Sequence, residues 1–378
     1  MYRRECWHVA QREQGAVIVE NRVVRQRVRA ALLLAVVGSL LAGCAANETG
    51  QTDSNLVGTL DGAGSSAQSA AQDVWVSAFQ RANSRVTVNY EPSGSGAGRE
   101  QFIAGGVDFA GSDAALSDDE LENEFGSCAP GTSGINFPVY VSPLVLVFTV
   151  DGVDTLRLDA ATIAGIFSNQ ITRWNDPALV ALNEGAALPD AAITAVHRSD
   201  DSGTTKNFTD YLYQNEPEIW GSEPADAFPF SGEAAQGNAG VVNAVADGTN
   251  AIGYVDASRA GGLDVAELKV GGEFVVYSAE AAAAIIDASP LADRDNPNDI
   301  VVNIDRTSTA SGVYPLVLVS YLIACQQYAD PETGQLVREY FESVADEDGQ
   351  AAAATDAGSA PLSSATAERV LAAIATIE

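Results

Sequence analysis

The sequence predicts an α/β fold with largely parallel sheets, and two observations point to it. Segments with strand character alternate with segments of helical spacing along most of the 378 residues. In addition, three strand-like segments each run into a turn rich in glycine and hydroxyl side chains, and a helical segment follows each turn. A chain of this length can form two domains with cores of their own.

The three units share one layout, in which an apolar strand, a polar turn and an amphipathic helix follow one another. We predict strands at residues 56–60, 85–90 and 191–196, and helices at residues 67–80, 99–104 and 206–213. The turns between them read Asp61-Gly-Ala-Gly-Ser-Ser66, Ser93-Gly-Ser-Gly-Ala-Gly98 and His197-Arg-Ser-Asp-Asp-Ser-Gly-Thr-Thr205. Taken singly, each turn fits an ordinary capped helix start, since Ser and Thr are common N-caps.

The rest of the chain continues the alternation of strands and helices. Residues 107–110 and 251–255 predict short strands, and the long apolar run 138–150 predicts a strand buried on both faces. Ser117 with Glu120 predicts a capping box. Residues 228–238 and the acidic segment 293–299 are predicted to be loops, the latter solvated. Further helices are predicted at residues 159–167, 239–247, 280–288, 338–344 and 365–377.

The N-terminal part has the features of a secretory signal. Four arginines within residues 22–29 precede the apolar run 30–41, which is too short to span a membrane. Leu41-Ala42-Gly43-Cys44 follows and resembles a bacterial lipobox. We therefore expect residues 1–43 to be a lipoprotein signal peptide, Cys44 to be lipidated, and residues 44–55 to be a tether. An ordinary cleaved signal with a chance cysteine is the alternative.

The charge excludes several classes of partner. Formal net charge is −31, and residues 1–43 hold seven arginines against three glutamates, so the remainder has 13 basic and 48 acidic residues. Nucleic acid is excluded as a partner because phosphate backbones need a basic surface. An anion can be bound only at a local, enclosed site, since surface charges act over about 8 Å at physiological salt.

The remaining motifs argue against an enzyme or a metal site. Gly94-x-Gly96-x-Gly98 departs from the dinucleotide fingerprint in its third glycine, and Ser95 is not centred in a G-x-S-x-G motif. His197 is the one histidine outside the signal segment, and no Cys-x-x-Cys occurs, so a zinc site is not expected. We expect neither a metal nor a cofactor.

Three polar turns at helix starts favour an anion site. In open α/β sheets such turns meet at the carboxyl ends of the strands, where helix N-termini offer N–H groups and partial positive charge. Asp113 follows a further predicted strand. A carboxylate there would repel sulfate but accept the proton of a protonated phosphate, and would thereby discriminate between the two. The alternative is that Asp113 only caps the following helix.

Five separated motifs resemble the phosphate-binding subunit of the high-affinity phosphate ABC transporter, the PstS family. The resemblance covers residues 56–255 closely and the rest loosely. The motifs occur in the family's order: Asp61-Gly-Ala-Gly-Ser-Ser66, Asn89-Tyr-Glu-Pro-Ser-Gly-Ser95-Gly-Ala-Gly98, Val107-Asp-Phe-Ala-Gly-Ser-Asp113-Ala, Arg198-x-Asp200-x-Ser202-Gly-Thr204 and Ala251-Ile-Gly-Tyr-Val255.

The resemblance implies a role for each matching residue. Asp113 would accept the phosphate proton, and Arg198, held by Asp200, would donate charge-assisted hydrogen bonds. Some relatives have Phe at position 67, where this sequence has Ala. Only the backbone of Ala67 could therefore bind phosphate. Hydroxyls and amides of the turns would complete a phosphate-binding set of Ser66, Ala67, Ser95, Asp113, Arg198, Ser202, Gly203 and Thr204.

The resemblance also implies the architecture and the function. It predicts a two-domain periplasmic-binding-protein fold (type II, Venus-flytrap) with two mainly parallel sheets and a hinge. Domain I would comprise residues 56–149 and 278–378, and domain II residues 150–277. The function would be that of a monomeric, non-enzymatic receptor, anchored by lipid on the outer face of the bacterial cell membrane, that delivers phosphate to transporter permease subunits. A receptor for sulfate or molybdate, a phosphatase-like hydrolase, and a sensory or adhesive protein are the alternatives.

Two cysteines remain after Cys6 in the signal segment and Cys44. Outside the cytoplasm Cys128 and Cys325 can form a disulfide. Two separate buried thiols are the alternative.

Overall fold

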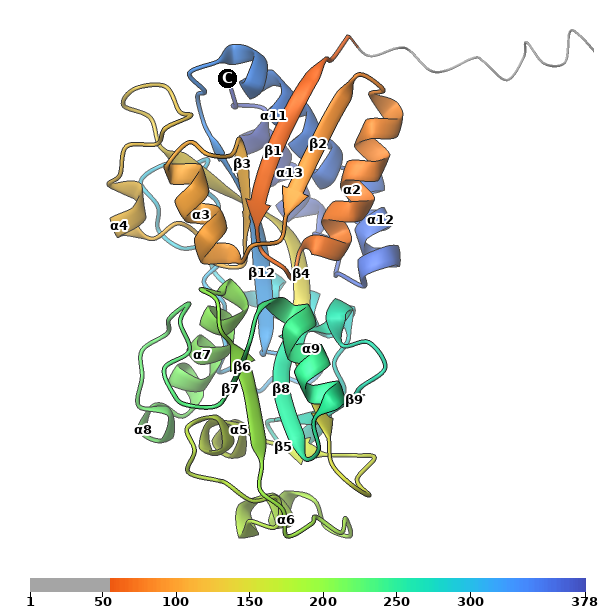
Figure 1. Cartoon of the computed structure of the whole chain (residues 1–378). Coiled ribbons are helices and arrows are strands. Elements are labelled where there is room, and N and C mark those ends of the chain that lie inside the picture. Colours follow the sequence, from red (N-terminus) through yellow and green to blue (C-terminus); the bar gives the residue numbers. More distant parts are fainter. Residues whose placement is uncertain (1–54) are drawn as a thin grey trace, which may run out of the picture. The chain divides into compact units, whose positions relative to one another are not determined.

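A computed structural model describes residues 55–378 (Figure 1). The expected signal peptide, Cys44 and most of the tether lie outside the described residues. The strands are β1 (Gly58–Gly64), β2 (Val86–Glu91), β3 (Phe109–Ser112), β4 (Gly134–Thr149), β5 (Arg157–Leu158), β6 (Thr194–Arg198), β7 (Glu233–Ala235), β8 (Ala251–Asp256), β9 (Asp264–Val265), β10 (Glu267–Val270), β11 (Glu273–Val275) and β12 (Val317–Cys325).

The helices alternate with the strands, as the sequence predicts for an α/β fold. They are α2 (Ser69–Ala82), α3 (Ser95–Ile103), α4 (Asp118–Leu121), α5 (Ala160–Phe167), α6 (Pro177–Leu182), α7 (Gly203–Asn215), α8 (Pro217–Trp220), α9 (Gly237–Asp247), α10 (Ala279–Ala288), α11 (Pro331–Ala345), α12 (Glu347–Ala357) and α13 (Ser364–Ile374), with a 3₁₀ turn at Ala257–Arg259. Within residues 55–378 we find no helix that is both long enough and apolar enough to cross a membrane.

The elements form two lobes that share β4 and β12 (Figure 1). The first lobe contains β1, β2 and β3 with α2, α3, α11, α12 and α13, and the second contains β6, β7 and β8 with α5, α7, α8 and α9. Strand order is β2-β1-β3-β12-β4-β8-β6-β7, and β9 pairs with β4. A separate sheet has the order β11-β10-β5.

The expectation of mainly parallel sheets needs a correction around β4 and β12. Parallel pairs join β1 to β2 and β3, and β6 to β7 and β8. In contrast, β12 is antiparallel to β3 and β4, and β4 is antiparallel to β8. The reason is topological, because β4 takes the chain out of the first lobe and β12 brings it back. The proposed domain boundaries stay a prediction.

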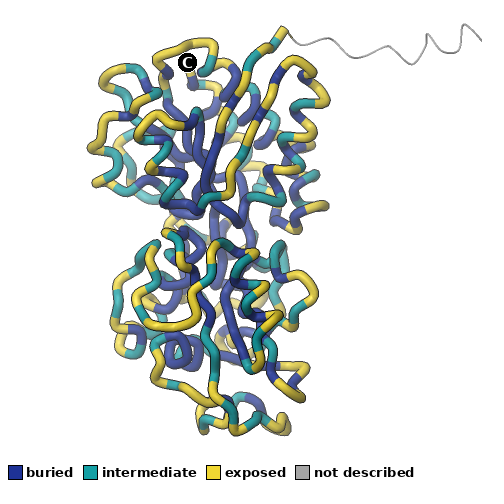
Figure 2. The backbone as a smooth tube through the Cα atoms, in the orientation of Figure 1, coloured by how far each residue is buried: buried dark blue, intermediate teal, exposed yellow. Residues whose placement is uncertain are grey.

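Strand β4 is buried along almost its whole length, as its apolar sequence predicts. Every residue from Gly134 to Phe148 is buried, and so is all of β12. Figure 2 shows this buried path in dark blue through both lobes. Since the first part of β4 pairs with β12 and residues 144–149 pair with β8, one strand anchors both lobes.

Aromatic side chains fix the helices that matter for the site. In the first lobe Phe109 of β3 packs against Tyr340 and Phe341 of α11. In the second lobe the rings of Phe208 on α7 and Tyr254 on β8 stack with centroids 4.1 Å apart. This packing holds the N-terminus of α7 at the carboxyl end of β6.

Some local structures differ from what the sequence predicts. Helix α3 begins at Ser95 instead of residue 99, directly after Gly94 with φ of 105°. The predicted loop 228–238 contains β7, and α12 was not predicted because its alanines form no apolar stripe. The solvated loop is wrong at Asp299, which is buried and accepts hydrogen bonds from the Asn136 amide and Arg294.

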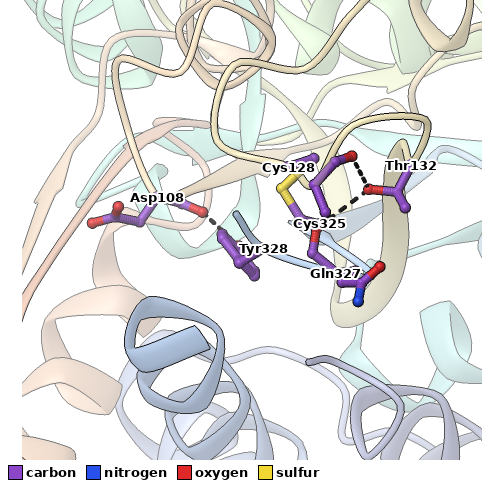
Figure 3. The surroundings of a disulfide bond; sticks show 7 residues. Asp108, Cys128, Thr132, Cys325, Gln327 and Tyr328 are labelled. Atoms are coloured by element: carbon purple, nitrogen blue, oxygen red, sulfur yellow. Dashed lines mark hydrogen bonds between the residues drawn. A yellow bond between two sulfur atoms is a disulfide. The ribbon is translucent and has the colours of Figure 1, made fainter. Parts of the chain in front are cut away.

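A disulfide joins Cys128 to Cys325, the last residue of β12 (Figure 3). It links positions 197 residues apart. Beside it, the Tyr328 hydroxyl donates to the Asp108 carbonyl at 2.6 Å, and the Thr132 hydroxyl donates to the Gln327 carbonyl at 3.3 Å (Figure 3). A cross-link over so long a loop restricts the unfolded chain and so stabilises the first lobe.

Candidate functional site

The polar turns meet where β1, β3 and β6 end. The Gly94 amide donates to the Gly64 carbonyl at 2.8 Å, and the Gly96 amide donates to the Asp201 carbonyl at 3.0 Å. The first contact joins two turns of the first lobe, and the second joins the first lobe to the second. The predicted convergence of the turns is therefore present in the structure.

Two glycines allow this close approach. A Cβ on Gly64 would lie 1.9 Å from the Gly111 carbonyl oxygen, and its φ is 141°. A Cβ on Gly203 would lie 2.7 Å from Ser95 Oγ and 2.9 Å from Asp113 Cβ. Any side chain at residue 203 would therefore separate the start of α7 from the first lobe.

Asp113 is the centre of the site. Its side chain is buried and its carboxylate accepts three hydroxyl hydrogen bonds. Ser65 and Ser320 donate to Oδ1 at 2.5 and 2.6 Å, and Thr204 donates to Oδ2 at 2.9 Å. Burial raises the pKa of Asp113, and the three hydroxyls and Arg198 oppose this rise. Asp113 thus contacts other parts of the site, and the following helix α4 is capped by Ser117.

Arg198 supplies a buried positive charge from the end of β6. The residue is 2% exposed, and its guanidinium binds Asp200 through two hydrogen bonds, from Nε at 2.8 Å and from Nη2 at 2.5 Å. Its Nη1 donates to Thr204 Oγ1 at 3.3 Å. Burial alone would raise the pKa of Asp200, but hydrogen bonds and the charge of Arg198 hold that pKa below its ordinary value. Asp200 is therefore a fixed carboxylate that orients the guanidinium.

The serines of the turns have different surroundings. The Ser66 hydroxyl accepts from the Asn238 main-chain and side-chain nitrogens at 3.2 and 3.1 Å. Ser95 Oγ accepts from the Asp113 amide at 3.1 Å, and Ser202 Oγ accepts from the Thr205 amide as the N-cap of α7. The Ala67 amide donates to Ser65 Oγ at 3.0 Å.

Several residues of the site were not predicted from the sequence. Ser65 was passed over for its neighbour Ser66, and the sequence alone offers no means to choose between two adjacent serines. Ser320 lies 207 residues from Asp113, so no local pattern identifies it. Asn238 stands at the start of α9 in a segment predicted to be a loop.

A buried ion pair also joins the lobes beside the site. Arg99 on α3 binds Glu120 and Asp226, each at 2.8 Å, and its own side chain is 5% exposed. Because Glu120 belongs to the first lobe and Asp226 to the second, Arg99 bridges the two. The charge of Arg99 is thus matched by two carboxylates, whereas within the described part of the chain Arg198 is paired with Asp200 alone and also donates to Thr204 beside Asp113.

A cavity of about 290 Å³ adjoins the site on the side of the α7 start. Asp113, Lys206 and Asn207 lie in its wall, together with Arg306. The Asn207 amide group donates to the Asp113 carbonyl at 2.6 Å and closes one side of the site. Among residues 55–378 we find no group of three or more histidine, cysteine and acidic side chains placed to hold a metal.

Asp256, a second buried carboxylate near Asp113, gives a prediction about pH. Its Oδ1 accepts from Tyr140 and Ser258, and Oδ2 has no partner in the described part of the chain. Burial raises the pKa of Asp256 from 3.8 to about 6. The stability that Asp256 contributes is therefore full below its unfolded pKa and is lost as pH rises through about 6, by up to about 3 kcal/mol.

We expect Asp256→Asn to raise the melting temperature by several degrees at pH 8 and to change it little at pH 4, because the amide cannot ionise. Thermal unfolding at the two pH values measures this. The exposed Asp154→Asn is the matched control and should have no pH-dependent effect. An equal shift of Asp256→Asn at both pH values would contradict the assignment.

Comparisons with known proteins agree on one kind of protein. A family model described as the PBP superfamily domain matches residues 49–347. The phosphate-binding protein PstS 3 of Mycobacterium leprae is 35% identical over 335 residues, which cover 83% of this chain and 89% of the relative. The phosphate-binding protein PstS of Pasteurella multocida is 31% identical over 291 residues, which cover 75% of this chain and 81% of that relative.

Solved structures are similar in fold. A high affinity periplasmic phosphate-binding protein (PfluDING), bound with phosphate, has a TM-score of 0.67 at 25% identity and covers 83% of this chain and 93% of its own. The phosphate binding protein from Stenotrophomonas maltophilia has a TM-score of 0.66 at 22% identity, with 84% and 94% covered.

Proposed function

Since the chain belongs to the PBP superfamily and, within it, to the PstS family of phosphate-binding proteins, we propose that it binds inorganic phosphate between its two lobes for transport. One observation supports this most directly. A buried carboxylate, Asp113, lies within hydrogen-bond reach of a hydroxyl that also contacts the buried guanidinium of Arg198. An anion that keeps a proton can satisfy both groups at once, whereas a fully ionised anion cannot.

The other predicted residues would complete the site. Ser66 and Ser95 would supply hydroxyls. Thr204, whose hydroxyl donates to Asp113, would bind through its backbone amide at the start of α7. The starts of α2, α3 and α7 direct backbone N–H groups and partial positive charge toward the same place. Ala67, Ser202 and Gly203 would contribute through the backbone. Ser202 Oγ already caps α7, so its hydroxyl serves the helix in this arrangement.

Binding would favour the closed arrangement of the lobes. Contacts across the lobes already include Thr204 with Asp113, Ser66 with Asn238, and Arg99 with Asp226. A phosphate held by residues of both lobes would add contacts that an open form lacks, and this difference in contacts would shift the population.

The wider role we propose follows the family. The protein would be exported, anchored to the outer face of the cell membrane through lipidated Cys44, and would deliver phosphate as a monomer to the permease subunits of an ABC transporter. It would bind phosphate without catalysis. The acidic composition agrees with an exported, soluble receptor whose anion site is enclosed.

Calorimetric titration of the purified, ligand-free protein with phosphate and with sulfate tests this function. We expect tight phosphate binding at one site and far weaker sulfate binding. Sulfate binding as strong as phosphate binding would instead support a receptor for another oxyanion. Turnover of a generic phosphate ester by the same preparation would support a hydrolase and contradict a receptor without catalysis.

A further inference from the structure

We propose that a buried, hydrogen-bonded series of four side chains holds Asp113 as a pure hydrogen-bond acceptor. The series consists of Tyr340, Gln72, Gln68 and Ser320. The four residues would thereby determine the preference for a protonated oxyanion without touching it. The selectivity part of this proposal rests on the proposed phosphate binding. The effect of the hydrogen-bonded series on Asp113 itself does not depend on phosphate binding.

The four side chains form an unbroken series of hydrogen bonds. The Tyr340 hydroxyl donates to Gln72 Oε1 at 2.6 Å, and Gln72 Nε2 donates to Gln68 Oε1 at 3.0 Å. Gln68 Nε2 donates to Ser320 Oγ at 2.8 Å, and Ser320 Oγ donates to Asp113 Oδ1 at 2.6 Å. Each of these side chains belongs to a residue at most 1% exposed, so water does not compete.

The direction of the series is fixed by a carbonyl group. The same Gln68 atom that faces Ser320 also lies 2.9 Å from the Tyr321 carbonyl oxygen. A carbonyl oxygen can only accept, so this atom is the amide nitrogen, and Gln68 Oε1 faces Gln72. Because Gln68 donates to Ser320 Oγ, the single proton of that hydroxyl is left to point at Asp113.

The other hydroxyls at Asp113 are directed in the same way. Ser65 Oγ accepts from the amides of Ala67 and Gln68, so its proton goes to Asp113. Thr204 Oγ1 accepts from Arg198 and donates to Asp113. Three O–H donors occupy three of roughly four acceptor positions of a carboxylate, and one remains for the proton of an incoming anion. If Asp113 were protonated, its own O–H group could not donate to these three hydroxyls, because each of them already donates to Asp113.

Packing alone does not explain two glutamines at these positions. Gln68 precedes α2 and Gln72 lies one turn later on the face that meets β12 and α11. Buried amides are costly unless every group is bonded, and apolar side chains of similar size would fill the same space. Other ionisable groups that act on Asp113 are Arg198, Asp256 and Tyr90. They are the same in every variant below, so a difference between variants reports the hydrogen-bonded series itself.

The titration of Asp113 in the ligand-free protein directly tests the effect of the hydrogen-bonded series. Carbon-13 NMR of aspartate carboxyls, assigned with Asp113→Asn, would follow the group from low to high pH. We expect Gln68→Leu to raise the pKa of Asp113 by about one to two pH units, since a donor to a charged group is no longer directed at it. Tyr340→Phe should raise the pKa less, in the same direction.

Gln350→Leu is the matched control. Gln350 is also a buried glutamine of the first lobe, but its side chain binds Val139 and Val344 carbonyls and the Leu362 amide. This control should leave the Asp113 titration at its wild-type position. An unchanged Asp113 pKa in folded Gln68→Leu overturns the proposal. If that variant does not fold, Gln72→Met and Tyr340→Phe decide, and wild-type titration in both overturns it.

Ligand titrations then test the effect on selectivity. Phosphate and sulfate binding would be measured from pH 5 to pH 8 on wild type, Gln68→Leu and Gln350→Leu. We expect the ratio of phosphate to sulfate affinity to fall about tenfold in Gln68→Leu alone, and sulfate to bind up to a higher pH. An unchanged ratio contradicts the specificity role. A wild type that binds no phosphate contradicts the proposed function. In that case the ligand-free titration still decides whether the hydrogen-bonded series acts on Asp113.

Discussion

Arg198→Met is expected to lower phosphate affinity by about two to three orders of magnitude, the largest effect of any single substitution considered for this chain. Arg198 is the buried cation next to Asp113, and the anion would take its charge-assisted hydrogen bonds. Its removal also leaves Asp200 at the site without its cation, so that carboxylate would repel the ligand. Calorimetric titration of the variant with phosphate measures the loss.

The chain offers a matched control for this substitution. Arg173 forms an ion pair with Asp190 in the second lobe, but its side chain is 51% exposed. Arg173→Met should therefore leave phosphate affinity at the wild-type value, because an exposed pair contributes little. Arg198→Lys should lie between the two, since an ammonium keeps the charge but cannot bind Asp200 and the anion in one plane. Wild-type affinity in Arg198→Met would place the anion site elsewhere.

Asp113→Asn is expected to collapse the discrimination between phosphate and sulfate. The carboxylate accepts a proton from phosphate and repels an anion that has none, whereas an amide does neither. We expect phosphate affinity to fall by about tenfold and sulfate affinity to rise by about tenfold or more, so that the two approach each other. Competition titrations at pH 8, where sulfate carries no proton, measure the ratio.

Asp256→Asn is the control for charge alone. Asp256 is also fully buried and interacts electrostatically with Asp113, but it accepts from Tyr140 and Ser258 instead of the hydroxyls of the site. If it removes the discrimination as strongly as Asp113→Asn does, the local field decides selectivity and proton acceptance at Asp113 does not. Retained discrimination in Asp113→Asn would assign that residue a structural role.

The polar turns of the candidate site were predictable because their parts are local. Each turn joins a strand to a helix within a few residues, and hydroxyls beside glycine at a helix start are visible in the sequence itself. Arg198 and Asp200 are two residues apart, so the pairing of their side chains is a local property too. The α/β class followed from the alternation of apolar periods.

The fold class, the polar turns, the buried strand at residues 138–150 and the acidic charge that requires an enclosed anion site can be inferred from the sequence. The identity of the side chains that direct their protons at Asp113 depends on the tertiary structure. Ser320 comes from β12, and Gln68 and Tyr340 are joined through packing of α2 against α11, which no local pattern records. The antiparallel pairing of β4 with β12 and β8 likewise could not be predicted from the local sequence. Residues far apart in sequence meet only through the shared core, and hydrogen-bond direction depends on every neighbour that the core supplies.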